Sequence, residues 1–345
     1  MPTPAAKRVL IALVVLICLA AAATGFYLHR ARRPLPAAAA ANPGAAPSVL
    51  SELPADAPAL AYIDVAALRK LQGSPLAAVL GLAGASPASD RDYANFVRAT
   101  GFDYTRDLDK AAIAFWPAGR IGSAGIFDRA VAIADGRFDR AKIEAYALRT
   151  GRVIARGSES IYVVPGNPPD AFEFLSPTRI MLASGKDPVS LLGPFQSRPR
   201  DPVTQALIDR VSAASLFAVA RTDNLPSTFY SVFHSYPQLE GLARNIQGLT
   251  LAGQPKASDL QLTLDAQCDS MTHAIEVSTM LDGLRMLGSM ALSDPKTRRE
   301  MTRDEVALAT AVLAEAKLTH QDRWVRLTFD VTPTMLGSSG ADPKQ

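Results

Sequence analysis

The sequence has few of the residues that stabilise small secreted folds or bind transition metals. Two of its 345 residues are cysteine and four are histidine. Cys18 lies in an apolar run and Cys268 stands alone, so we expect no disulfide within the body, which neither requires nor excludes an oxidising compartment. No cluster of cysteine and histidine has the spacing of a zinc site. We therefore expect no metal and no cofactor.

Familiar catalytic motifs are also missing. The sequence contains neither the Gly-x-Ser-x-Gly elbow of many hydrolases nor the Gly-x-Gly-x-x-Gly loop of dinucleotide-binding proteins. Ser293 and Lys296 have Ser-x-x-Lys spacing, but Pro295 directly precedes the lysine in a charged connection. We predict a noncatalytic protein. A hydrolase stays an alternative, because catalytic residues assemble from distant positions of a chain.

Isolated polar residues have simple structural explanations. Asp103, Asp107 and Asp109 fall in the polar segment GFDYTRDLDK, where solvated charges are expected. Asp135 and Asp265 each follow an apolar strand pattern, which favours capping or turn roles. None of these carboxylates indicates acid–base chemistry.

Positive charge is concentrated at the start of the chain. Five of the 36 basic residues and none of the 33 acidic residues fall within residues 1–33, so the remainder holds 31 basic against 33 acidic residues. A body with this balance has no excess positive field with which to attract nucleic acid. We expect no nucleic-acid partner.

Residues 9–28 form an uncharged, strongly apolar stretch of 20 residues. As a helix it would extend about 30 Å, which matches the hydrocarbon thickness of a bilayer. It therefore predicts a single membrane anchor. The alternative is a cleaved signal peptide with Lys7 and Arg8 as its charged region and residues 21–23 as its small-residue cleavage site.

The flanking charges alone do not fix the orientation of this segment, since Lys7 and Arg8 stand against Arg30, Arg32 and Arg33. Large domains cross the membrane largely regardless of flanking charge, and the first half of the segment also matches an export signal. We predict a single-pass inner-membrane protein with its C-terminal body in the periplasm.

Composition divides the chain into five parts. Residues 34–48 are rich in alanine and proline and carry no charge, which is typical of a semi-extended tether. The predicted parts are an anchor or signal segment (1–33), a linker (34–48), a first half of the body (49–198), a second half (199–337) and a flexible tail (338–345).

The two halves of the body have similar patterns of elements. Strand patterns at residues 130–134 and 260–265 each precede an aspartate and a helix, at residues 142–149 and 272–292 respectively. Both halves also end alike, in PVSLLG and PTMLG. These similarities predict an α+β fold made of two pseudo-repeats, each with antiparallel strands and helices packed on one face.

The order of these segments also supports a resemblance. An apolar anchor, an Ala/Pro tether, the opening PADAPALAYIDVAALR at residues 54–69 and a twofold α+β body resemble uncharacterised membrane-anchored proteins of the bacterial envelope. The resemblance implies a location and an architecture. It provides no catalytic residues.

One apolar surface is a candidate binding site. Aromatic residues gather after Pro226, and methionine and leucine recur along the long helix predicted at residues 272–292. Methionine adapts to irregular shapes, so such a surface suits an acyl chain or a partner helix, although ordinary core packing explains it too. The candidate residues are Phe229, Tyr230, Phe233, Met280, Leu284 and Leu287.

These observations lead to three functional hypotheses. The first is a noncatalytic envelope protein with a protein-interaction or scaffolding role. The second is binding of a lipid or another hydrophobic ligand. The third is the hydrolase with an unfamiliar site.

Overall fold

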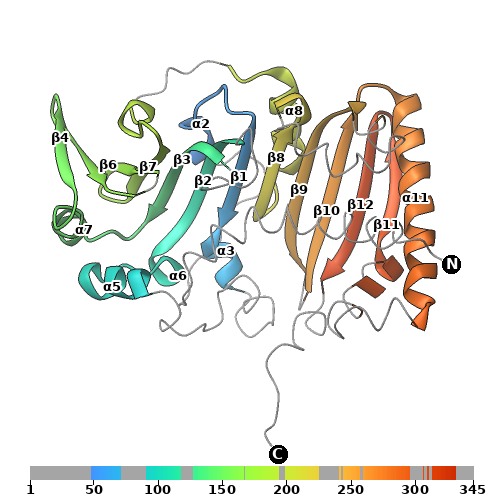
Figure 1. Ribbon diagram of the computed structural model, residues 1–345, viewed down its shortest axis with the longest axis horizontal. Coiled ribbons are helices and arrows are strands. Elements are labelled where there is room, and N and C mark those ends of the chain that lie inside the picture. Colours follow the sequence, from blue (N-terminus) through green and yellow to red (C-terminus); the bar gives the residue numbers. More distant parts are fainter. Residues whose placement is uncertain are drawn as a thin grey trace, which may run out of the picture.

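The computed structural model places most of the predicted body (Figure 1). The described residues are 48–70, 91–117, 127–166, 168–193, 199–224, 241, 244–256, 259–295, 306, 309–310 and 313–331.

Twelve strands within these ranges form one antiparallel sheet, in the order β11-β12-β10-β9-β8-β1-β2-β3-β7-β6-β5-β4. The two halves of the body meet where β1 pairs with β8, near the middle of the sheet. The strands are β1 (Ala59–Asp64), β2 (Leu108–Pro117), β3 (Phe127–Gly136), β4 (Arg152–Arg156), β5 (Glu159–Val164), β6 (Asp170–Ser176), β7 (Arg179–Gly185), β8 (Leu216–Arg221), β9 (Ile246–Lys256), β10 (Asp259–Cys268), β11 (Lys317–Gln321) and β12 (Trp324–Val331).

Helices connect and cover these strands. The long α11 runs along the β11 end of the sheet, whereas α5 and α7 lie at the β4 end (Figure 1). The helices are α2 (Ser48–Ser51), α3 (Val65–Arg69), α5 (Arg91–Thr100), α6 (Tyr104–Asp107), α7 (Arg140–Ala147), α8 (Pro202–Val211) and α11 (Met271–Ser293).

Helices cover both faces of the sheet, not one face as the sequence pattern suggested. Successive residues of a strand point to opposite faces. On β10, Asp265 contacts Arg210 of α8, while its neighbour Ala266 packs in a cluster with Ala274 and Val277 of α11. The two helices therefore lie on opposite faces. The reason is that both faces of the strands carry apolar residues, and each apolar face needs cover.

The larger core lies on the α8 face. It joins both halves of the sheet, because Leu60 of β1, Val131 of β3 and Phe217 of β8 belong to one buried cluster with Leu50 of α2 and Leu207 of α8. All five side chains are at most 3% exposed. A separate cluster forms under α7, and another forms under α11.

Most expected elements are present, with small changes of boundary. The predicted strands at residues 130–134 and 260–265 lie within β3 and β10, and the predicted helices at 142–149 and 272–292 correspond to α7 and α11. Two further strand pairs form where β4 meets β5 and where β6 meets β7. Asp139 caps α7 by accepting a hydrogen bond from the Lys142 amide at 3.2 Å.

Helix α8 was not predicted, although a local signal for its start is present in the sequence. Asp201 caps this helix by accepting from the amides of Val203 and Thr204, and Pro202 occupies its first turn. Both residues are typical of a helix start.

The predicted membrane segment, residues 9–28, lies outside the described residues, as do the tether and the tail. In the part of the chain that the structure describes, no helix is both long and apolar enough to cross a membrane.

Candidate functional site

The outer side of α11 is the largest concentration of exposed apolar side chains among the described residues. Across all described residues, nine large hydrophobic side chains are substantially exposed, and five of them belong to this helix. At 100° per residue, Met271, Ile275, Met286 and Met290 fall within an arc of roughly 100°. The exposed fractions are Met271 61%, Ile275 44%, Met286 61%, Leu287 59% and Met290 70%.

Three of the predicted surface residues lie on this helix. Leu287 is exposed, whereas Met280 and Leu284 are half-buried between the outer side and the sheet. The other three, Phe229, Tyr230 and Phe233, lie outside the described residues. The prediction omitted the most exposed methionine, Met290, because a run of apolar residues does not by itself reveal which side faces the sheet.

The inner side of α11 packs on the sheet and thereby fixes the position of the helix. Ala274 and Val277 pack on Ala266, Cys268 and Val325 of the sheet, and all five are at least nine-tenths buried. Burial raises the pKa of the Cys268 thiol to about 11, with a smaller contribution from the charge of Asp269. A buried neutral thiol is a poor nucleophile.

The start of α11 is a polar cap. The Ser270 side chain accepts from the His273 amide at 3.2 Å, and the His273 ring pairs with Asp269. The hydrogen bond that the His273 ring donates to the Asp269 carboxylate raises the pKa of His273. The pairing of His273 with the preceding turn agrees with a helix-terminal role. The described residues include no group of three side chains placed to hold a metal ion.

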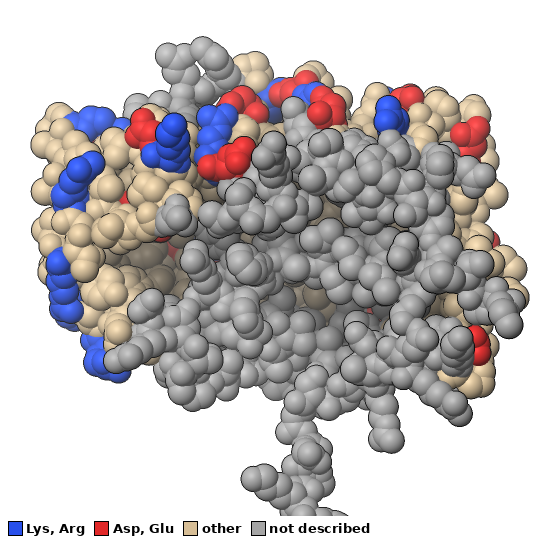
Figure 2. Space-filling view, in the orientation of Figure 1, with Lys and Arg blue, Asp and Glu red and all other residues tan. Residues whose placement is uncertain are grey.

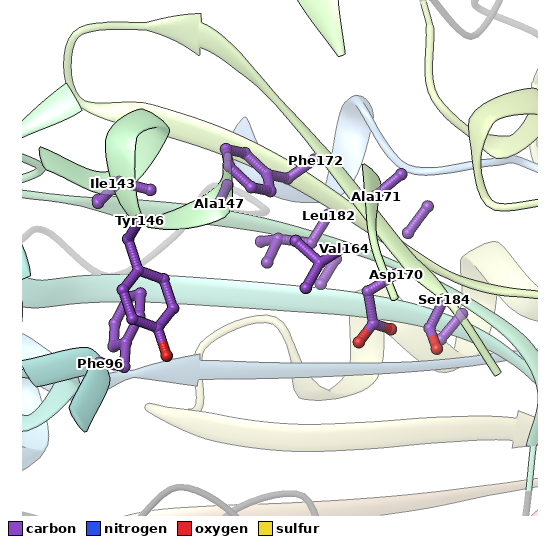
Figure 3. A pocket seen from close by; sticks show the side chains of 13 residues that line it. Phe96, Ile143, Tyr146, Ala147, Val164, Asp170, Ala171, Phe172, Leu182 and Ser184 are labelled. Atoms are coloured by element: carbon purple, nitrogen blue, oxygen red, sulfur yellow. The ribbon is translucent and has the colours of Figure 1, made fainter. Parts of the chain in front are cut away.

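A cavity of about 280 Å³ lies at the other end of the sheet, on the face that α11 also covers (Figure 3). Phe96 of α5 and Tyr146 of α7 form one wall, and their rings meet edge to face at 5.4 Å. Ala132, Leu182 and Phe172 form the floor, on β3, β7 and β6. The same end of the molecule has basic side chains along its rim (Figure 2).

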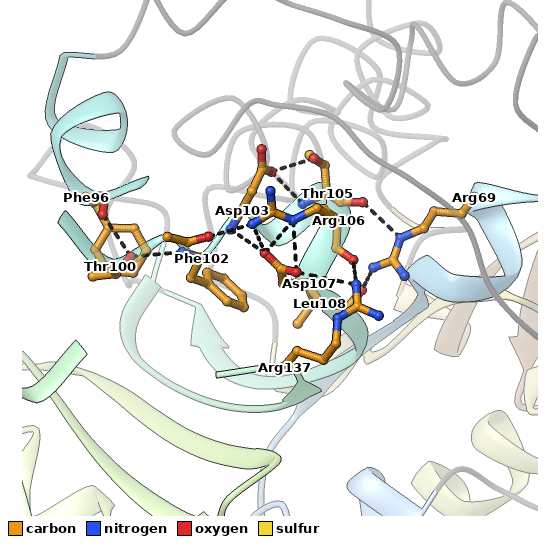
Figure 4. Close-up of polar contacts among 11 residues, drawn as sticks. Arg69, Phe96, Thr100, Phe102, Asp103, Thr105, Arg106, Asp107, Leu108 and Arg137 are labelled. Atoms are coloured by element: carbon orange, nitrogen blue, oxygen red, sulfur yellow. Dashed lines mark hydrogen bonds and ion pairs between the residues drawn. The ribbon is translucent and has the colours of Figure 1, made fainter. Parts of the chain in front are cut away.

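A polar network lies beside β2, where the sequence suggested solvated carboxylates (Figure 4). Asp103 caps α6 by accepting from the Thr105 amide at 3.0 Å. The Asp107 carboxylate accepts from the Asp103 amide at 3.0 Å and pairs with Arg106 at 2.6 Å and Arg137 at 3.4 Å. Asp107 is 8% exposed, so this expectation was wrong for that residue.

The ionisation of Asp107 argues against general acid catalysis there. Burial alone would raise its pKa, but hydrogen bonds from Arg106, the Asp103 amide and Arg137 outweigh burial and lower it. A general acid needs a raised carboxyl pKa. The network therefore has a structural role, in which it ties the α6 turn to Arg137, directly after the end of β3.

Arg69 anchors the other side of this network from a buried position. Its guanidinium donates to the carbonyls of Thr105, at 2.9 Å, and Leu108, and it pairs with Asp109 at 3.2 Å. The side chain is fully buried. Its donors are matched to main-chain acceptors, which is how a buried charge is tolerated. No local sequence pattern predicts this role.

Asp135 and Asp265 are not the capping or turn residues that their positions suggested. Each is a cross-strand partner of an arginine on the next strand, Arg179 on β7 and Arg326 on β12 respectively. Asp135 meets Arg179 at 2.6 Å, and Asp265 meets Arg326 at 2.7 Å. Asp265 also pairs with Arg210 at 2.6 Å. A strand pattern cannot predict such pairs, because the partner lies many residues away.

No protein-family model and no curated protein matches this chain. Among solved structures, three crystal forms of a protein called TP0453 have low structural similarity to this chain. Forms III and IV have TM-scores of 0.46 at 11% and 10% identity, and form I has 0.44 at 11%. The matches cover 87%, 85% and 85% of this chain and 98%, 96% and 96% of the other. Similarity at this level does not define a shared function.

Proposed function

We propose that this chain is a noncatalytic, membrane-anchored protein of the bacterial envelope that holds a partner protein through the outer side of α11. One observation carries the proposal: this helix alone has five of the nine large, exposed hydrophobic side chains of the described residues. Exposed apolar side chains gathered on one element are typical of an interaction site.

The charge distribution of α11 supports a protein partner. From Met286 to Ser293 the helix carries no charged residue, while Met286, Leu287 and Met290 in this part are all exposed. Interface centres are depleted in charge and enriched in methionine. Methionine also adapts to the shape of a partner.

Site-specific crosslinking in living cells tests this proposal. A photoreactive phenylalanine analogue at Met290 of the full chain should give a discrete protein adduct, and a second Met286→Glu substitution should remove it. Gln205 is the matched control position, because it is exposed on α8, which covers the opposite face of the sheet. The adduct is expected at Met290 and not at Gln205.

Two results would contradict the proposal. One is the absence of any adduct at Met286 and Met290, and the other is an equal adduct at Gln205. Folding is not expected to complicate the test, because changes at exposed positions usually alter the free energy of unfolding by less than about 0.5 kcal/mol. Near-ultraviolet circular dichroism of the Met286→Glu variant checks this.

The proposed location has its own test. We propose that residues 9–28 remain as an anchor and that the body lies in the periplasm. A reporter enzyme fused after Gln345 should then be active only when exported, and an epitope tag before the anchor should stay on the mature chain. A reporter active only in the cytoplasm would refute the orientation, and loss of the tag would favour a cleaved signal.

We further propose that residues 49–198 and 199–337 are two copies of one ancestral unit. Outward from the β1–β8 pair, the strand order is β1-β2-β3-β7-β6 on one side and β8-β9-β10-β12-β11 on the other. The pairs Asp135–Arg179 and Asp265–Arg326 occupy the same place in these two orders, on the third and fourth strands. Both observations support the repeat.

A further inference from the structure

The floor of the cavity near α7 has open space where small residues stand beside large ones. Ala132 of β3 lies directly opposite Leu182 of β7, which lies opposite Phe172 of β6. Leu182 is 40% exposed although its strand has neighbours on both sides. An inner-strand leucine is normally covered. It is open here because Ala130 and Ala132 leave the adjacent space empty, and because α7 stands over only part of the floor.

The walls of the cavity are mainly apolar, and its polar groups lie together. Phe96, Ile143 and Tyr146 stand at one end (Figure 3). Asp170 and Ser184, which are cross-strand partners on β6 and β7, stand at the other. Among the described residues that line the cavity, Asp170 alone carries a charge at neutral pH. A ligand there would find an apolar interior and a hydrogen-bond acceptor at one end.

The volume limits the size of the ligand. A water molecule, with one non-hydrogen atom, takes about 30 Å³ in the liquid, so the cavity of about 280 Å³ holds about nine such atoms. An engineered apolar cavity of about 150 Å³ accepts benzene. A chain of about eight carbons with one polar end fits the space, and a two-chain phospholipid does not.

We propose that this cavity binds the single alkyl chain of a small amphiphile whose polar end is neutral or cationic, such as a primary alcohol or amine. The chain lies over Ala132 and Leu182, and the polar end donates a hydrogen bond toward Asp170 and Ser184. A carboxylate end is disfavoured by the negative charge of Asp170. This site is separate from the outer side of α11 and does not depend on a protein partner.

Photolabelling of the full chain in phosphatidylcholine nanodiscs tests the proposal. The probe is 1-octanol with a diazirine on its chain, and mass spectrometry locates the label. We expect saturable labelling of peptides that contain Tyr146, Phe172 or Leu182. Unlabelled 1-octanol and octylamine should compete at concentrations about tenfold lower than octanoate, because only octanoate brings a second negative charge next to Asp170.

Variants make the assignment specific. Ala132→Phe fills the floor with a residue that suits a strand, and it should lower the labelling about tenfold or more. Ala155→Phe is the matched control, because Ala155 is exposed on β4 and does not line the cavity. It should leave labelling unchanged. Asp170→Asn should abolish the preference for octylamine over octanoate and keep octanol binding.

Three outcomes would overturn the proposal. They are labelling of these peptides that does not saturate, equal labelling of Ala132→Phe and the parent chain, and competition in which octanoate is the strongest. If Ala132→Phe loses its near-ultraviolet circular dichroism, Leu182→Phe replaces it as the blocking variant from the opposite strand.

Discussion

The two ends of the sheet bury an acidic side chain in different ways. At the β11 end, Asp265 is 1% exposed and receives hydrogen bonds from two arginines, Arg210 and Arg326. At the β4 end, Glu173 is 2% exposed and pairs with one arginine, Arg156, at 2.6 Å. The other oxygen of Glu173 is buried without a hydrogen-bond partner.

This difference sets the sign of the pKa shift at each end. Burial raises the pKa of Glu173, and the single arginine only partly opposes it. Burial also acts to raise the pKa of Asp265, but the hydrogen bonds from Arg326 and Arg210 outweigh it, so that pKa is lowered. Whether an internal carboxylate stays ionised therefore depends on how many hydrogen-bond donors it is paired with, rather than on burial itself.

The largest expected effect is the loss of the Asp265 charge. Asp265→Asn leaves Arg210 and Arg326 without their shared partner, and breaking a buried pair of this kind should lower the free energy of unfolding by about 3 kcal/mol. Asp135→Asn is the matched variant on the other side. Its parent carboxylate is 25% exposed, so the loss should be about 1 kcal/mol.

Tryptophan fluorescence during urea unfolding can report separately on the two parts of the sheet that lie on either side of the β1–β8 pair. The chain has two tryptophans, and each ring lies under an arginine at 4.1 Å, Trp116 under Arg129 and Trp324 under Arg210. Asp265→Asn should change the native emission of Trp324 in a Trp116→Phe background. Equal destabilisation by Asp135→Asn and Asp265→Asn would contradict the comparison.

The pH dependence of stability should have opposite signs for the two acids. Because the folded pKa of Asp265 is lowered, its stabilisation is present above about pH 4 and is lost as the pH falls toward that lowered value. Because the folded pKa of Glu173 is raised, its contribution is most favourable below about pH 4 and is lost as the pH rises through the raised value.

A smaller effect is therefore expected for Glu173→Gln. At pH 7 this variant should unfold within about 1 kcal/mol of the parent chain, since the ionised form it replaces is disfavoured by burial. Urea unfolding at pH 4, 5.5 and 7 measures both variants against the parent. The parent should lose stability relative to Glu173→Gln as the pH rises, and gain relative to Asp265→Asn. A common slope would refute the proposed difference.

The smallest expected effect concerns the rate of a chemical reaction rather than stability. Cys268 is fully buried under α11, so its thiol should react with a maleimide only when that helix lifts from the sheet. A Cys18→Ser background isolates this thiol. Val277→Ala should speed the reaction, because it weakens the contact of α11, whereas Ile143→Ala under α7 should not. Fast labelling of the folded parent chain would show that α11 is not docked as described.

Local patterns predicted the elements well and their partners poorly. β3, β10 and α11 follow from apolar patterns that are local in the sequence, so their predicted boundaries lay within a few residues of the observed ones. The assignment of helices to one face was wrong, because alternation along a strand shows two faces but not what covers each. The Arg69 anchor and the Asp265 cluster join residues 36 to 61 positions apart, and no local pattern encodes such distances.

For the candidate sites too, the local sequence predicted some features and missed those that depend on distant residues. The repeated methionines of α11 identified an apolar helix, but only its packing shows that Met286 and Met290 face outward. The cavity near α7 was not predicted at all. It depends on Ala132 and Leu182 lying opposite each other on strands that are 50 residues apart in sequence, as the register shows.

The short helix α2 also determines how the body would carry mechanical load. Arg200 donates to the carbonyls of Pro54, at 3.1 Å, and Leu53, and Arg179 pairs with Glu52. Tension along the preceding residues 34–48 would thus enter at Ser48 and be shared between β7, which carries Arg179, and the segment before α8, which carries Arg200. Because these contacts come before β1 in the chain, they would carry the load before that strand does.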